Sequence, residues 1–356
     1  MTPEQTTRLE EARALFDSDL IYLNTATLGL PPRHAWHELQ DALYEWRSGT
    51  AYPPKYDASV NRARRAYAEL CGLDPNLVAT GSQASPYVGL IAGWLPDGAE
   101  VLIGEGEFTS LLFPFLAQAG RGIKVREVPL ERLADEVRPG TTLVAVSAVQ
   151  SSNGYVTDLD VLRTACAATG TEMLVDLTQA AGWLPVDASQ YAFTVASGYK
   201  WLLSPRGTAY FSVRADLLDQ IIPANANWYA GQDPWDSIYG SPLRLAPDAR
   251  RLDLSPAWHS WIAAAPALEL LRDIGAETLH AHSTGLAARF RTACGLRPSN
   301  SAIVSAVADP EVPELLKAAR IVGAVRAGRL RLSFHLSTSQ ADTDRAAELL
   351  HPHLRD

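Results

Sequence analysis

Between about residues 70 and 215, short apolar runs alternate with stretches whose apolar residues recur at helical spacing. Turn residues separate the two kinds of segment. This order is typical of strands joined by crossover helices, which build a parallel sheet covered on both faces. The seven predicted strands are residues 77–80, 100–103, 124–128, 143–149, 173–177, 193–196 and 208–213.

The two ends of the chain have different patterns. Thr2 and Gln5, with Pro3 between them, have the spacing of a capping box, so a short docking helix is expected to begin there. Amphipathic helices are expected through residues 36–46 and 60–70. Further on, residues 261–274 predict a helix, and residues 302–307 and 329–334 predict strands of a smaller sheet.

These patterns predict an α/β protein with a large domain and a smaller α+β domain at the C-terminus. We expect an N-terminal helix that packs on the small domain (residues 1–20), the large domain (21–250) and the small domain (251–356). Residues 221–251 are rich in Trp, Pro, Asn, Asp and Gly, which indicates irregular loops at a site rim or a partner contact.

The composition argues against several classes of protein. The chain has 356 residues, of which 31 are Lys or Arg and 40 are Asp or Glu, and the net charge of −9 disfavours binding to nucleic acid. No run of about 20 apolar residues and no secretory signal is found, so a cytoplasmic protein with no membrane partner is expected. The three cysteines lie far apart, and no metal site is predicted.

Two residues indicate the chemistry. Asp176 lies at the carboxyl end of a buried strand and Lys200 at the end of a neighbouring one, so both are expected at the carboxyl edge of the sheet, where doubly wound folds bind ligands. A carboxylate can keep a pyridine nitrogen protonated, and a lysine can form a Schiff base with an aldehyde. Together they indicate a pyridoxal 5′-phosphate site.

Several ordered motifs extend this interpretation. Residues 175–182, 197–202 and 205–207, together with 22–26 and 330–335, resemble the aminotransferase class V family of fold-type I pyridoxal phosphate enzymes. That family includes cysteine desulfurases, kynureninases, isopenicillin epimerase-like proteins and carbon–sulfur lyases. The resemblance covers nearly the whole chain and implies a pyridoxal phosphate-dependent enzyme of amino-acid metabolism.

The resemblance implies roles around the cofactor ring. Lys200 would form the internal aldimine and later move the α-proton of the substrate. Asp176 would pair with the ring nitrogen, and Gln179 would donate a hydrogen bond to the ring hydroxyl oxygen. Phe108 would stack on the ring at the place where many relatives carry a histidine, and a phenylalanine cannot transfer protons.

A second group of residues is expected around the phosphate. Residues 80–85 lie between a strand and an apolar helix, and a helix N-terminus favours an anion. Ser82 and Gln83 are the expected contacts there, and Ser197 and Tyr199 would reach the phosphate from the other side. Ser255 resembles the residue that, in related dimers, reaches the partner's phosphate, which implies a homodimer with shared active sites.

A third group would bind the amino-acid substrate. Arg331 matches the arginine that binds the α-carboxylate, although Arg326 and Arg329 are nearby alternatives. The other implied substrate contacts are Asn24, Ser151 and Asn153.

The reaction type stays open among several outcomes. The resemblance implies that a desulfurase would carry a cysteine shortly before the carboxylate-binding arginine, and none lies between Leu316 and Arg331. Abstraction of the α-proton followed by transamination or by β-elimination, as in a carbon–sulfur lyase, is the leading expectation. The alternatives are a racemase or epimerase, a kynureninase-like hydrolase and a binding protein without turnover.

Overall fold

A seven-stranded sheet forms the centre of the computed structural model, which describes residues 2–356. The strand order is β2-β8-β7-β6-β5-β3-β4, and β8 alone runs antiparallel to its neighbours. The predicted sheet, with seven mainly parallel strands, is therefore confirmed. The strands are β2 (Val78–Gly81), β3 (Glu100–Gly104), β4 (Lys124–Val128), β5 (Thr141–Ser147), β6 (Glu172–Asp176), β7 (Phe193–Ser197) and β8 (Ala209–Val213).

Helices cover both faces of this sheet, and the residues of β5 show how. Leu143 and Ala145 belong to the core that α4 and α5 complete, while Val144 and Val146 belong to the core of α3, α6 and α7. Because both faces are buried, the strand is a continuous apolar run instead of an alternating one. No helix within residues 2–356 combines the length and the hydropathy of a bilayer span. The helices are α3 (Pro53–Leu70), α4 (Ala84–Trp94), α5 (Thr109–Leu116), α6 (Leu159–Thr169) and α7 (Trp258–Ile274).

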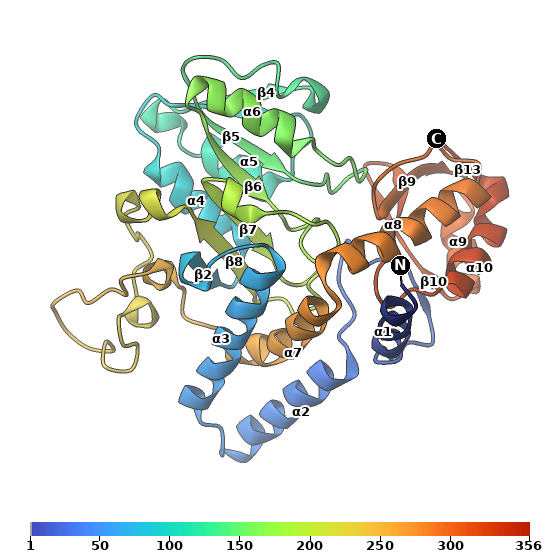
Figure 1. The fold of residues 1–356 in the computed structure, drawn as a ribbon, viewed down its shortest axis with the longest axis horizontal. Coiled ribbons are helices and arrows are strands. Elements are labelled where there is room, and N and C mark those ends of the chain that lie inside the picture. Colours follow the sequence, from blue (N-terminus) through green and yellow to red (C-terminus); the bar gives the residue numbers. More distant parts are fainter. Residues whose placement is uncertain (1) are drawn as a thin grey trace.

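A second, antiparallel sheet forms near the C-terminus, as the sequence predicts. Its order is β11-β12-β9-β13, and its core includes Phe290 of α8 and Leu332 of β12. Figure 1 shows α8, α9 and α10 around these strands, to the right of the large sheet. The elements are α8 (Ala276–Ala293), β9 (Ile303–Ala308), α9 (Val312–Ala318), β11 (Ala324–Arg326), β12 (Arg329–Ser333), α10 (Gln340–Leu350) and β13 (Leu354–Arg355).

The N-terminal segment lies against this C-terminal region (Figure 1). Helix α1 (Pro3–Arg13) begins with the predicted capping box of Thr2 and Gln5, and the Gln5 side chain donates to Thr278 of α8 at 3.1 Å. Strand β1 (Ile21–Tyr22) then pairs in parallel with β10 (Ile321–Val322). Helix α7, by contrast, packs on α2 (Arg33–Ser48) and α3. The division at residues 20 and 250 stays a prediction.

Residues 221–251 are irregular, as expected, with only short 3-10 turns (Figure 1, yellow). A cluster of three tryptophans, Trp228, Trp235 and Trp258, attaches this segment to the rest of the molecule. The indole N–H groups of Trp235 and Trp258 both donate to Asp57 of α3, at 2.8 and 3.0 Å. The tryptophans therefore pack the segment onto the body of the protein.

Candidate active site

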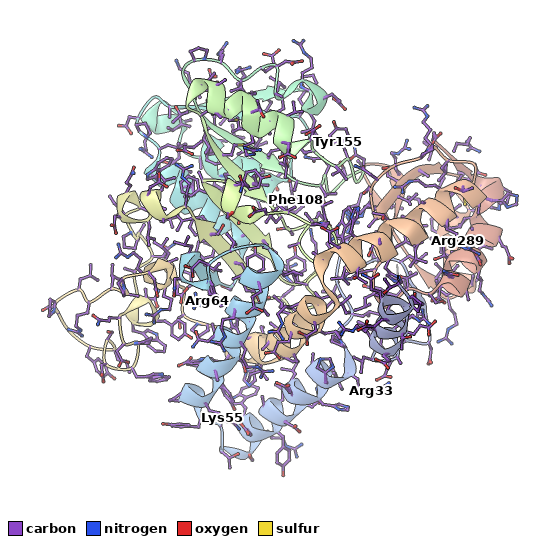
Figure 2. All side chains as sticks on the ribbon, in the orientation of Figure 1. Arg33, Lys55, Arg64, Phe108, Tyr155 and Arg289 are labelled. Atoms are coloured by element: carbon purple, nitrogen blue, oxygen red, sulfur yellow. The ribbon has the colours of Figure 1, made fainter. Side chains whose placement is uncertain are left out.

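The carboxyl ends of three parallel neighbouring strands, β5, β6 and β7, border a cavity of about 270 Å³. The strands end at Ser147, Asp176 and Ser197, which all line it. Figure 2 places Phe108 at these strand ends, near the middle of the molecule. Of the sequence-predicted site residues, the cavity is lined by Ser82, Gln83, Phe108, Ser151, Asp176, Gln179, Ser197, Tyr199 and Lys200.

Lys200 is one of four lysines in the chain, and it is the buried one, with 7% of its surface exposed. Burial lowers the pKa of its amine to about 8. The positive charges of Arg331, Arg326 and Arg206 lower this pKa as well, and the carboxylate of Asp176 opposes them. A substantial fraction of the amine is therefore neutral near physiological pH, as a nucleophile or a base must be.

Gly29, from the N-terminal part of the chain, packs against the backbone of Tyr199 and Lys200. The N–H of Gly29 donates to the carbonyl of Tyr199 at 2.9 Å, and a Cβ at Gly29 would lie 2.1 Å from the carbonyl oxygen of Lys200. No side chain fits at that distance. The turn around Gly29 therefore brings the N-terminal segment directly against the lysine.

Asp176 is buried beside this amine. Its Oδ1 accepts a hydrogen bond from the N–H of Thr178 at 2.8 Å, and no lysine or arginine within residues 2–356 forms an ion pair with it. Burial raises the pKa of Asp176, while Thr178 and Lys200 lower it. A buried carboxylate that faces a cavity without a bonded cation suits a protonated ring nitrogen.

Glu107 supports the site from behind its lining residues, and the sequence assigned it no role, although it directly precedes Phe108. Its carboxylate accepts from the N–H and the hydroxyl of Ser147, at 2.7 and 2.6 Å, and from the amide of Gln150 at 2.7 Å. Burial raises the pKa of Glu107, and these bonds lower it. The side chain fixes the end of β5 and the start of α5, where the Phe108 ring centroid lies 5.5 Å from the amine of Lys200.

The N-terminus of α4 supplies a place for an anion. Gln83 is the N-cap residue and makes no side-chain capping bond, so first-turn N–H groups stay available. The hydroxyls of Ser82, Ser85 and Ser197 border the cavity and bond to no other residue of the described chain. This donor set suits a phosphate group.

Other lining residues were not singled out from the sequence: Ser85, Ser110, Ser147, Thr178 and Arg206. Ser85 and Arg206 belong to segments that the sequence did mark, residues 80–85 and 205–207, and could have been found there. Arg206 stacks on the ring of Tyr199, with its guanidinium carbon 4.5 Å from the ring centroid. Thr178 also belongs to a marked segment, residues 175–182, whereas Ser110, two residues after Phe108, has nothing in its own pattern that distinguishes it.

Gln179 is engaged more fully than the sequence indicated. Its amide nitrogen donates to the carbonyl of Ala26 at 3.0 Å and to the hydroxyl of Ser151 at 3.1 Å. Its Oε1 accepts from the indole of Trp201 at 2.7 Å. A bond from Gln179 to the ring hydroxyl stays a prediction and would require one of these donors to change partner.

The structure separates the three candidate arginines. Arg331 is 2% exposed and donates to both oxygens of Ser151 and, at 2.7 Å, to the hydroxyl of Thr27. Burial lowers the pKa of Arg331 to about 10. Arg329 bonds instead to Ser305 on the neighbouring strand, and Arg326 is exposed and donates to Thr27. The geometry favours Arg331 as the buried carboxylate contact, because Ser151 lines the cavity.

Four expected contacts do not line the cavity: Asn24, Asn153, Ser255 and Arg331, which bonds to the lining residue Ser151. The Oδ1 of Asn24 is buried and has no hydrogen-bond partner among residues 2–356. The Oδ1 of Asn153 accepts from the N–H of Tyr155, a residue that Figure 2 places between the large sheet and the C-terminal region. Ser255 is exposed just before α7. Their roles stay predictions.

One cluster of possible metal ligands lies apart from the cavity lining. Single ligand atoms of Asp309, Glu311 and His353 lie within 4.8 Å of one another. The guanidinium of Arg355 bonds to Asp309 and already balances its charge. The cluster is therefore explained by ion pairing.

Comparisons with known proteins identify the family. The Aminotransferase class-V family matches residues 58–310, and the chain belongs to this family. The isopenicillin N epimerase of Streptomyces clavuligerus is 27% identical over 341 residues, which cover 86% of this chain and 82% of the epimerase. The uncharacterized aminotransferase YcbU of Bacillus subtilis is 27% identical over 308 residues, covering 80% of this chain and 81% of YcbU.

Solved structures have the same fold. A C-DES structure with glycine covalently linked to the PLP cofactor superimposes with a TM-score of 0.85 at 21% identity, covering 96% of this chain and 99% of that one. The complex of the cystine C–S lyase C-DES with cysteine persulfide gives a TM-score of 0.82 at 21% identity, covering 94% and 98%. The fold is that of the fold-type I pyridoxal phosphate enzymes, as expected.

The residues of this chain fit the cofactor of the family. The cavity has a buried amine, a buried carboxylate, an aromatic side chain, and free hydroxyls beside a helix N-terminus. In pyridoxal phosphate, the amine would meet the aldehyde, the carboxylate the ring nitrogen and the aromatic side chain the ring face. The hydroxyls and the helix N-terminus would meet the phosphate. The protein is a pyridoxal 5′-phosphate-dependent enzyme that acts on amino acids.

Proposed function

We propose that the protein is an aminotransferase of an α-amino acid, with Lys200 as the group that moves the α-proton. The observation that carries this proposal is the single buried amine among the residues lining the cavity. When bound, pyridoxal 5′-phosphate withdraws electrons from the α-carbon and makes its proton acidic. Transamination then requires one amine that removes the α-proton and returns it to a different carbon close by.

The proposed roles of the surrounding residues follow from their positions. Arg331, fixed by Ser151 and Thr27, would hold the α-carboxylate and so orient the α-carbon toward Lys200. Asp176 would hold the proton of the ring nitrogen. Phe108 would cover the ring and exclude water, and its side chain can neither donate nor accept a proton.

A second candidate is β-elimination from an amino acid with a sulfur leaving group. The same base serves both reactions, and a thiolate leaves without a general acid, which Phe108 could not provide. Persulfide transfer by a cysteine of this chain is not supported, because all three cysteines are buried. Burial raises the pKa of Cys71 and Cys166 to about 12 and of Cys294 to about 11.

The test is to load the purified protein with pyridoxal phosphate and incubate it with a panel of L-amino acids, with and without 2-oxo acid acceptors. Keto acid formed in equal amount with a new amino acid is expected. Pyruvate with sulfide or ammonia, independent of acceptor, would favour the lyase. Appearance of the D-isomer, or of hydrolysis products of kynurenine, would favour the racemase or hydrolase alternatives and contradict the transaminase proposal.

We also propose a homodimer with active sites shared across the interface. Helix α2 presents Trp36, Tyr44 and Trp46 with 49%, 69% and 66% of their surfaces exposed. The segment 221–251 adds Tyr239 and other exposed apolar residues. Large exposed aromatic side chains in groups are typical of protein interfaces. Ser255, exposed nearby in the chain, would contact the partner's phosphate.

The dimer predicts a mass in solution of twice one chain, measured by light scattering after gel filtration at micromolar concentration. Trp46→Glu is expected to shift the population toward one chain, because it would bury a charge at the interface. Exposed Glu131→Gln, on the short 3-10 turn after β4, serves as the matched control. A wild-type protein of single-chain mass would contradict the proposal.

The proposed location is the cytoplasm, where thiols stay reduced. The three cysteines are free in the structure, and this supports the proposal.

A further inference from the structure

Arg326 stands at the tip of the β11–β12 hairpin. The two residues of its turn, Ala327 and Gly328, have φ values of 47° and 74°, as the tightest hairpin turns require. Arg326 pairs across the hairpin with Arg329. The guanidinium of Arg326 extends from this hairpin to the N-terminal segment, where it donates to the hydroxyl of Thr27 at 3.3 Å.

Thr27 thereby holds two arginines at once. The same hydroxyl oxygen accepts from Arg331 at 2.7 Å, so the two guanidinium groups are close neighbours that share one neutral hydroxyl. No carboxylate within residues 2–356 forms an ion pair with either of them. Two adjacent positive charges repel, and a neutral hydroxyl cannot balance them.

This positive region stands out in a chain of net charge −9. It also acts on the reactive amine, because both arginines lower the pKa of Lys200. An uncompensated pair of guanidinium groups beside an amino-acid site is an arrangement that binds anions.

Arg331 is buried and Arg326 is exposed, and this difference suits the binding of two separate anions. Arg331 is 2% exposed and held by Ser151 and Thr27, so its position is fixed beside the cavity. Arg326 is exposed and bonds to the same hydroxyl of Thr27. The α-carboxylate of a substrate must lie at a fixed place next to the reacting carbon, whereas its side chain must extend away from it.

We infer that the substrate is an amino acid with a second anionic group on its side chain, which Arg326 binds while Arg331 binds the α-carboxylate. This inference rests on the proposed function, because it assigns the substrate class of the same site. A side-chain carboxylate a few carbon atoms from the α-carbon, as in aspartate, glutamate or 2-aminoadipate, has the required chemistry.

The experiment compares the cofactor-loaded wild type with Arg326→Gln, and with Arg329→Gln as the matched control from the same hairpin. Turnover is measured for glutamate against glutamine and for aspartate against asparagine. Binding is measured separately by calorimetry, with glutarate and pentanoate as unreactive probes with two carboxylates and one. The wild type should prefer the acidic substrates and glutarate by about 10- to 100-fold, the range of one charge-assisted hydrogen-bond pair.

Arg326→Gln should reduce this preference about 10-fold or more and leave glutamine and pentanoate within about 3-fold. Arg329→Gln should change neither, since Arg329 bonds to Ser305. Equal use of glutamate and glutamine by the wild type would overturn the inference. So would an equal loss for all ligands in Arg326→Gln, because both arginines would then serve one carboxylate. A protein that takes up no pyridoxal phosphate would instead refute the proposed function, before any amino acid is added.

Discussion

Lys200→Ala is expected to lose the visible absorbance of covalently bound cofactor and at least about a thousandfold of the turnover rate. The other three lysines are exposed, so no second amine can take its place at the cavity. Removing a buried amine from the cavity wall leaves the sheet and its two cores intact. The measurement is an absorbance spectrum of the purified variant with added pyridoxal phosphate, together with the rate on the best substrate.

Lys124→Ala is the matched control, because this lysine is exposed on β4, and it should behave as the wild type. A Lys200→Ala variant that keeps the absorbance band, or more than a tenth of the rate, would refute the assignment.

The same lysine predicts a pH dependence. Burial lowers its pKa to about 8, so the neutral amine becomes abundant as the pH rises through that value. The rate at which cofactor-free protein captures pyridoxal phosphate should therefore rise with a midpoint near pH 8 and level off about one pH unit above it. A rise centred near 10, where an ordinary lysine titrates at about 10.4, would contradict the assignment.

Asp176→Asn is expected to reduce turnover by about 100- to 1000-fold while the protein stays folded, the range measured for loss of one electrostatic contact in an active site. The amide has the same shape and its oxygen can still accept from Thr178, so the turn after β6 should persist. It cannot carry the negative charge that keeps a ring nitrogen protonated. Turnover and the dissociation constant of the cofactor are the measurements.

Asp160→Asn, at an exposed position on α6, is the control for loss of an acidic side chain. Asp176→Glu should restore part of the rate, because the charge returns in a slightly displaced position. Wild-type turnover in Asp176→Asn would show that the ring nitrogen does not depend on this carboxylate.

Much of the fold follows from local pattern. The apolar run of β5 is buried on both faces, and the predicted strand 143–149 overlaps Thr141–Ser147 with a shift of two residues. Such boundaries depend on tertiary hydrogen bonds that a periodic pattern does not contain. The capping box of Thr2 and Gln5 is fully local, and it forms as expected.

The site was less accessible to local reasoning. Asp176 and Lys200 could be found because Asp176 ends one strand and Lys200 comes shortly after the next, and parallel strands end at one edge of the sheet. The role of Glu107 could not, because its partners Ser147 and Gln150 lie 40 and 43 residues further along the chain. Gly29, too, shows its importance only where its N–H meets the carbonyl of Tyr199.

The sequence by itself determined the class of fold and the cofactor and predicted Lys200 as the reactive lysine, because these depend on the order of strands and on residue types at their ends. The tertiary structure decided which arginine is buried. Three arginines within six residues of one hairpin look alike in sequence, but in the fold Arg329 bonds to Ser305, whereas Arg326 and Arg331 both donate to Thr27, about 300 residues away in the chain. Only the folded chain brings these charges together, and their mutual repulsion is what makes an anionic substrate a physical expectation.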